Sequence, residues 1–157
     1  MIITFLGHST LSNDEGLREK IKRAIEKNIR DGEKTVFYCG GYGDFDTVCS
    51  SVCRSLRKEW DCELEIALVT PYITESQQKK LKYLMDNGMY DSIIYPPNEK
   101  VPPRFAIVKR NEWMIDKSEL VIAYVDREYG GAYKGLQYAL RKKKRIENLA
   151  RPALGNE

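Results

Sequence analysis

Short apolar runs alternate with amphipathic stretches along the whole chain. Runs rich in β-branched and aromatic residues predict strands at 1–6, 35–39, 64–69, 92–95 and 120–125, with a further short strand near 145–149. Stretches with apolar residues at helical spacing predict helices at 15–30, 46–60, 76–85, 104–117 and 132–143. Because strand and helix alternate, we expect an α/β, Rossmann-like fold: a mostly parallel β-sheet flanked by helices on both faces.

Turn-forming and capping residues punctuate this pattern. Asn13 or Asp14 can cap the first helix, and Gly32 follows its expected end. Pro71 stops the third strand, since proline has no amide hydrogen to donate. Four of the six prolines fall within 96–103, which predicts a non-helical connection there.

The length of the chain, 157 residues, suits one hydrophobic core, so we expect a single domain over 1–150 and a C-terminal tail at 151–157. No stretch approaches the roughly 18 to 20 apolar residues of a membrane span. The first residues also lack a basic leader with a cleavage site. We therefore expect a cytoplasmic protein with no membrane partner.

The charge balance is nearly even, with 26 basic and 23 acidic residues and a net charge of +3. Such a chain has no strong overall field for nucleic acid, and we do not expect a nucleic-acid partner. The dense basic run at 141–145 is typical of a solvated helix end, although a nucleic-acid patch or a contact to a ligand phosphate are alternatives.

The sequence gives little support for a metal site or a disulfide bond. The four cysteines contain no C-x-x-C pair, and His8 is the single histidine. Cys49 and Cys53 are spaced to share one face of a helix, where free cysteines usually behave as small buried hydrophobes. The sequence implies no metal site and no cofactor.

Glycine-rich loops follow three of the predicted strands, and these loops are the candidate ligand-binding segments. They are Gly7-His8-Ser9, Gly40-Gly41-Tyr42-Gly43-Asp44 and Gly130-Gly131-Ala132. Parallel strands bind ligands beyond their carboxyl ends, and the first amides of a following helix favour an anion. A phosphate group is the expected ligand of such loops, although they match neither the dinucleotide fingerprint nor a Walker loop.

The order and spacing of several motifs resemble the SLOG superfamily. These are the run from Gly40 to Asp46, the run from Arg110 to Ser118, the glycine pair with Ala132, and Tyr138-Ala139. The resemblance extends from Met1 to about Leu149. This superfamily contains Lonely-Guy-type nucleoside monophosphate phosphoribohydrolases and DNA-processing SMF/DprA proteins. The resemblance implies a Rossmannoid nucleotide-binding domain, and a homodimer as a possible assembly.

The phosphoribohydrolase branch carries a P-G-G-x-G-T-x-x-E loop that supplies phosphate contacts and a catalytic glutamate. Gly130 and Gly131 match its glycine pair, and Arg110 matches a ligand-contacting arginine. Tyr129 replaces the proline, and Gln137 replaces the glutamate. Glutamine cannot ionise, so it cannot act as a general base. The resemblance therefore supports ligand binding more strongly than hydrolysis, and no catalytic residue is identified.

Several candidate residues have structural alternatives. Arg110 would neutralise a phosphate, but it could instead be a surface arginine paired with Glu112 or Asp116. Asp44 and Asp46 would meet ribose hydroxyls or serve as turn and helix-cap residues. His8 would bond a phosphate or carry a proton, or be a hydrogen-bonded structural histidine. Tyr42 could stack on a base.

The leading hypothesis is a sensor or sequestering module that binds a phosphorylated nucleotide or a nucleotide-derived signalling ligand. Its expected ligand-binding residues are Gly7, His8, Gly40, Gly41, Tyr42, Gly43, Asp44, Asp46, Arg110, Gly130, Gly131 and Ala132. A second hypothesis is a nucleotide-cleaving hydrolase in which Glu128, Asp126 or Asp44 replaces the missing glutamate. A third is a single-stranded DNA-binding module, which the basic run alone supports.

Overall fold

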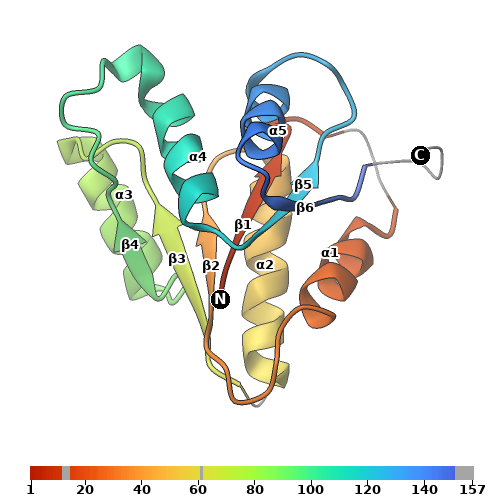
Figure 1. Cartoon of the computed structure of the whole chain (residues 1–157). Helices are drawn as coiled ribbons and strands as arrows, with labels where there is room; N and C mark the ends of the chain where they lie inside the picture. Colours follow the sequence, from red (N-terminus) through yellow and green to blue (C-terminus); the bar gives the residue numbers. More distant parts are fainter. Residues whose placement is uncertain (12–14, 61, 151–157) are drawn as a thin grey trace.

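A computed structural model describes residues 1–11, 15–60 and 62–150 of the chain (Figure 1). Its strands are β1 Ile2–Gly7, β2 Thr35–Cys39, β3 Leu64–Val69, β4 Ser92–Ile94, β5 Leu120–Tyr124 and β6 Arg145–Asn148. Its α-helices are α1 Leu17–Glu26, α2 Asp44–Glu59, α3 Glu75–Asp86, α4 Ala106–Lys117 and α5 Gly131–Arg141. The alternation predicted from the sequence is confirmed.

The strands form one parallel sheet in the order β4-β3-β2-β1-β5-β6. The chain adds β2, β3 and β4 on one side of β1 and then crosses to place β5 and β6 on the other side. The direction of strand addition thus reverses beside β1, where open α/β sheets have a crevice at the carboxyl ends of the strands. The expected Rossmann-like fold is confirmed.

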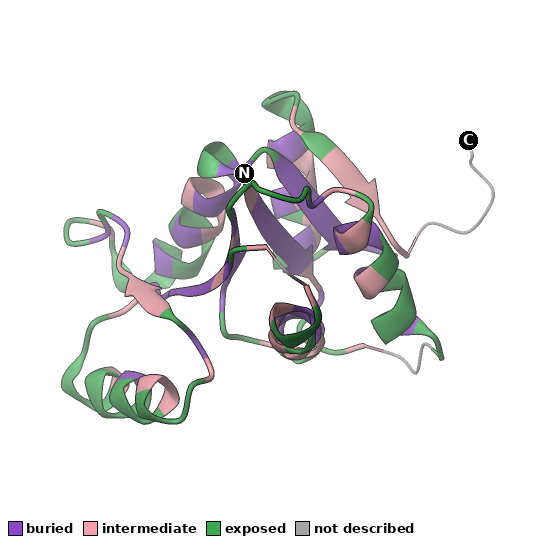
Figure 2. Ribbon diagram, turned by 90° about the horizontal axis from the view of Figure 1, so that it is seen from below, coloured by how far each residue is buried: buried purple, intermediate pink, exposed green. Residues whose placement is uncertain are grey.

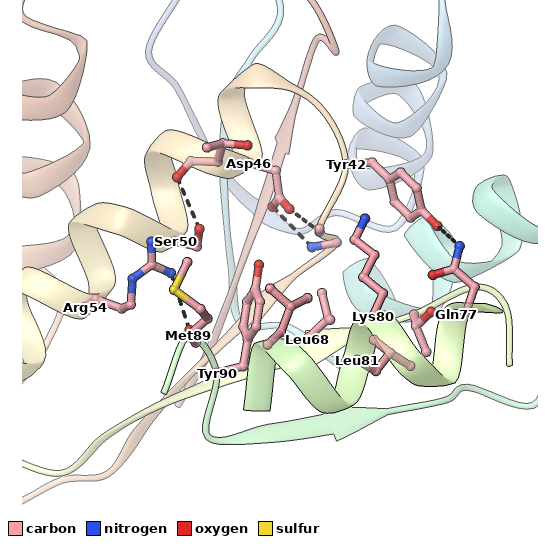
Figure 3. A pocket seen from close by; sticks show the side chains of 15 residues that line it. Tyr42, Asp46, Ser50, Arg54, Leu68, Gln77, Lys80, Leu81, Met89 and Tyr90 are labelled. Carbon is pink, nitrogen blue, oxygen red and sulfur yellow. Dashed lines mark hydrogen bonds between the residues drawn. The ribbon is translucent and has the colours of Figure 1, made fainter. Parts of the chain in front are cut away.

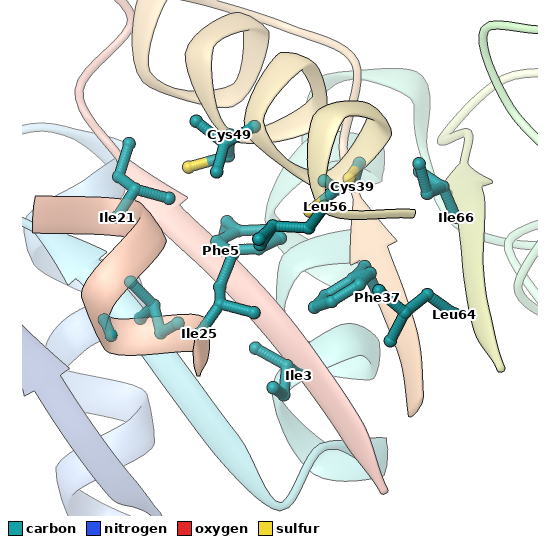
Figure 4. Close-up of a cluster of buried hydrophobic side chains, with 14 of the residues drawn as sticks. Ile3, Phe5, Ile21, Ile25, Phe37, Cys39, Cys49, Leu56, Leu64 and Ile66 are labelled. Carbon is teal, nitrogen blue, oxygen red and sulfur yellow. The ribbon is translucent and has the colours of Figure 1, made fainter. Parts of the chain in front are cut away.

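Helices cover both faces of this sheet, as expected (Figure 1). Side chains of β1 alternate between the two layers: Ile3 and Phe5 belong to the core cluster under α1 and α2, and Leu6 to the cluster under α5. Figure 4 shows the first cluster, in which Ile21 of α1 and Leu56 of α2 lie over the strands. Each fully buried side chain of this size contributes about 1.5–3 kcal/mol.

Burial follows the layers in Figure 2: the central strands are buried, while the outward faces of the helices are exposed. Cys49 and Cys53 share the buried face of α2, as their spacing predicted. Burial raises the pKa of both thiols. In the described part of the chain, no helix has the length and apolar character needed to cross a membrane.

The ends of several helices differ from the prediction by a few residues, among them the first and the fourth. The first helix spans Leu17–Glu26, with Gly16 at its N-cap in a left-handed conformation (φ 88°), so it begins and ends inside the predicted 15–30. The caps proposed at Asn13 and Asp14 fall outside the described residues. The fourth helix begins at Ala106 because a 3-10 turn, Pro103–Phe105, precedes it.

Candidate functional site

A cavity of about 570 Å³ opens above the carboxyl ends of the central strands. The loop after β1, the loop after β2, helix α4 and the loop from β5 to α5 surround it. The position is the one that the reversal of strand order predicts. Its volume lies within the roughly 300–1,000 Å³ of pockets that bury a small organic ligand.

Most residues proposed from the sequence meet in this cavity. Those that line it are Gly7, His8, Gly40, Tyr42, Gly43, Asp46, Arg110, Gly130, Gly131 and Ala132. Gly41 and Asp44 are not part of its lining. The exposed Asp44 carboxylate instead accepts a hydrogen bond from the Leu11 amide at 3.1 Å, which ties two loops together.

Asp46 organises the loop after β2 from inside the protein. Its side chain is 9% exposed, and its carboxylate accepts the backbone amides of Gly40, at 3.1 Å, and Gly41. Burial raises the pKa of Asp46, while these amide bonds and the nearby Arg110 oppose the rise. Two amides that we expected to present to a phosphate are therefore already occupied by an internal anion.

Packing also requires glycine at this side of the cavity. A Cβ at Gly7 would lie 2.3 Å from a ring carbon of Phe45, and one at Gly43 would lie 2.7 Å from the Ser9 Cα. Gly43 further has φ +89°, a conformation that other residues rarely adopt. The fold itself thus accounts for these two glycines, without any ligand.

Arg110 is a buried residue whose side chain bonds the ends of two strands. It is 3% exposed, and its Nη1 donates to the carbonyl oxygens of Gly40, at 2.7 Å, and Val69, at 2.8 Å. The alternative of a surface arginine paired with Glu112 or Asp116 is wrong, because among the described residues these acids bind other partners. Arg110 joins the ends of β2 and β3 and presents positive charge beneath the cavity.

The N-terminus of α5 forms the opposite, open wall. Gly130 is its N-cap, with φ 92° and no side-chain cap. The amides of Gly131, Ala132 and Tyr133 have no acceptor within the part of the chain that the structure describes. A Cβ at Gly131 would meet nothing within 4 Å, so packing does not require glycine there. These amides are free for an anion, which the helix dipole favours.

His8 lies at the side of the cavity near the end of β5. It is 6% exposed, and its Nε2 accepts the Asp126 amide at 3.1 Å. Burial, reinforced by the charge of Arg127, lowers the pKa of His8 despite the nearby Asp126 carboxylate. The lowered pKa favours the neutral ring, and its Nε2 also lies 3.2 Å from the Asp126 carboxylate oxygen.

Arg127 is a lining residue that the sequence reasoning missed. Its Nε lies 2.9 Å from the Asp126 carboxylate, and its Nη2 donates to the Thr10 carbonyl at 3.4 Å. The sequence did offer a signal, because Arg127 is a basic residue between the predicted strand 120–125 and the Gly130-Gly131 pair. Arg127 adds a second arginine to the cavity lining beside Arg110.

Two sequence candidates lie away from the cavity. Gln137 lines a separate hollow of about 280 Å³ formed by α4 and α5. The basic run ends at Arg145, which pairs with Leu120 at the start of β5 and so lies at the opposite edge of the sheet. This placement removes the basic run from any role in binding a phosphate in the main cavity.

Comparison with known proteins decides the family. The sequence model of the YpsA family, described as "YspA SLOG family", matches residues 11–153. The chain belongs to this family. The superfamily resemblance inferred from the glycine loops is thereby confirmed.

Relatives of this SLOG chain include UPF0398 proteins of Bacillus thuringiensis (strain Al Hakam) and Bacillus cereus (strain AH187). Each is 23% identical over 140 residues, which cover 85% of this chain and 74% of the relative.

Solved structures of DNA processing protein A share the fold. The Streptococcus pneumoniae protein aligns with TM-score 0.64 and 12% identity over 98% of this chain, and the Helicobacter pylori protein with 0.62 and 16% over 93%. The SLOG chain spans 51% and 63% of their lengths. The Helicobacter structure concerns a mode of single-stranded DNA binding. That neighbour does not fit our expectation that nucleic acid is not a partner.

Proposed function

We propose that this SLOG protein binds a phosphorylated nucleotide in the main cavity, as a sensor or sequestering module. The observation that carries the proposal is the open N-terminus of α5, where unoccupied amides face a cavity lined by Arg110 and Arg127. The phosphate would lie against Gly131 and Ala132. The exposed ring of Tyr42 would stack on the base.

The cavity favours binding over cleavage. Asp46 is the one acidic residue among the described residues that line it, and its carboxylate is already held by two amides. A general base must reach the substrate proton, and this carboxylate faces its own loop. Asp126 contacts His8 and Arg127, and Glu128 and Asp44 are absent from the lining.

The first experiment is mass spectrometry of small molecules released by heat from the purified protein, followed by thermal-shift assays with nucleoside monophosphates. A ligand that binds the native state raises its melting temperature. Recovery of an intact nucleotide supports the proposal. Recovery of a free base and ribose phosphate after incubation would instead identify a hydrolase.

A charge reversal at α5 locates the phosphate. Gly131→Asp puts a carboxylate in the first helical turn, which the helix dipole tolerates, yet it repels an anion. We expect nucleotide affinity to fall at least about tenfold with the melting temperature retained. Gly131→Ala, the steric control, should weaken binding only a few-fold. Equal binding by Gly131→Asp and the wild type would remove the phosphate from this helix.

Single-stranded DNA is the second candidate, favoured by the likeness to the Helicobacter protein. The two candidates differ in their dependence on salt. Binding to several phosphates of a strand falls steeply as salt rises, because counterions are released. A single nucleotide would show a much shallower dependence. Titrations at two salt concentrations therefore separate them.

A further inference from the structure

A second cavity, of about 200 Å³, lies on the other side of the loop after β2, between α2 and α3 (Figure 3). Gly40, Tyr42 and Asp46 line both cavities, so the two share one wall. The second cavity is smaller than the roughly 300 Å³ that a whole small-molecule ligand needs. Its size suits one terminal group of a ligand whose larger part occupies the main cavity.

Two cations line this second cavity without an acidic partner. Arg54 of α2 donates from Nη1 to the Met89 carbonyl at 3.3 Å, and Lys80 of α3 lies 5.7 Å from the centre of the Tyr42 ring. Neither forms a salt bridge with any residue that the structure describes. In Figure 3 the Lys80 ammonium reaches from α3 toward the loop that holds Tyr42.

The remaining polar groups in this cavity supply neutral hydrogen-bonding partners. Tyr90 is 8% exposed, and burial raises its pKa to about 12, so its hydroxyl stays neutral. The charge of Asp46 is already offset by two amides and the nearby Arg110. The cavity therefore holds an excess of positive charge and suits an anion.

The separation of the two anion sites restricts the ligand. One lies at the start of α5, and the other lies between α2 and α3 near the ends of β2 and β3. A nucleoside that stacks on the Tyr42 ring would lie between these two sites. The Tyr42 ring, with Arg110 and Lys80 each within 6 Å of its centre, stands between the two cavities.

We propose that the second cavity, through Lys80 and Arg54, binds a second phosphate on the far side of the nucleoside from the first. The ligand class is then a nucleoside with phosphates on both sides of its ribose, either as a free bisphosphate or dinucleotide or as part of a DNA strand. This inference deepens the proposed function and rests on it for the placement of the first phosphate.

Calorimetric titrations with AMP and with adenosine 3′,5′-bisphosphate test this inference. We expect the wild type to bind the bisphosphate at least about tenfold more tightly than AMP, the usual gain from one charge-assisted contact. Lys80→Gln should reduce this advantage to less than twofold while its affinity for AMP stays the same. Lys79→Gln, the neighbouring exposed lysine outside the cavity, is the matched control and should keep the full advantage.

Two results would overturn the inference: equal binding of both nucleotides by the wild type, or a tenfold advantage that survives in Lys80→Gln. An oligo(dA) ten-mer identifies the source of the phosphates. If the ten-mer binds in a Lys80-dependent way and more tightly than the bisphosphate, the ligand is a DNA strand. If the bisphosphate binds at least as well, it is a free nucleotide.

Inorganic phosphate separates failure of this inference from failure of the proposed function. If no nucleotide binds, the proposed function fails. Thermal shifts with inorganic phosphate then decide the second cavity alone. A shift in the wild type and in Lys79→Gln that disappears in Lys80→Gln supports the anion site. An identical shift in all three proteins, or none, contradicts it.

Discussion

The two glycine-rich walls of the main cavity look alike in sequence but differ in structure. The loop after β2 is filled by the protein itself, with the Asp46 carboxylate on its amides and Arg110 on its carbonyl. The start of α5 has the same kind of amides, and among the described residues nothing accepts from them. A glycine-rich loop therefore indicates backbone amides that can bind an anion. It does not indicate whether that anion is a ligand or a side chain of the protein itself.

Removal of the internal anion should have the largest effect. Asp46→Ala leaves the amides of Gly40 and Gly41 without their charged acceptor and removes the negative charge near Arg110, so we expect the free energy of unfolding to fall by about 3–5 kcal/mol. Urea denaturation measures this loss. Asp44→Ala, two residues earlier and exposed, should cost about 1 kcal/mol. A loss below that for Asp46→Ala would show that the first loop does not depend on its carboxylate.

Alanine scanning of the glycines should distinguish the two walls next. Gly43→Ala combines a positive φ with a clash against the Ser9 backbone, so we expect a loss of about 2–3 kcal/mol. Gly131→Ala meets open space and should change stability by less than about 0.5 kcal/mol. Thermal denaturation of both variants gives the comparison. Equal losses would mean that α5 also needs its glycine for folding.

The smallest expected effect concerns His8. Its folded pKa lies below its usual value of 6.5, so the unfolded chain takes up a proton before the folded chain does. The stability that depends on neutral His8 is present above pH 6.5 and is lost as the pH falls toward the folded pKa. Because His8 is the single histidine, His8→Asn should flatten this slope in urea titrations. An unchanged slope would assign it to acidic groups.

The fold could be predicted closely where the pattern was local. The strands Leu64–Val69 and Leu120–Tyr124 lie within one residue of their predicted bounds, because continuous apolar runs identify buried parallel strands. The start of α1 was less predictable, since Gly16 caps that helix through its backbone conformation and not through a side chain.

The site could be predicted in outline. Glycines at strand ends indicated the correct edge of the sheet, because that inference needs only parallel topology. The burial of Arg110 depends on carbonyls 70 and 41 residues away in the chain, and no local pattern carries that information. Lys80 was missed for a similar reason, since an exposed helical lysine looks the same whether or not a cavity lies beside it.

The reversal of strand order also has a consequence for the order of folding. The walls of the cavity come from two segments, one ending at Asp46 and the other beginning at Ile107 of α4, and the second wall is complete only when β5 pairs with β1. Contacts between segments so distant in sequence form late, because a long loop must close first. An intermediate with β1, β2 and β3 in place would have a sheet and one finished wall, but no binding competence. Ligand capture would therefore report completion of the last long-range strand pairing.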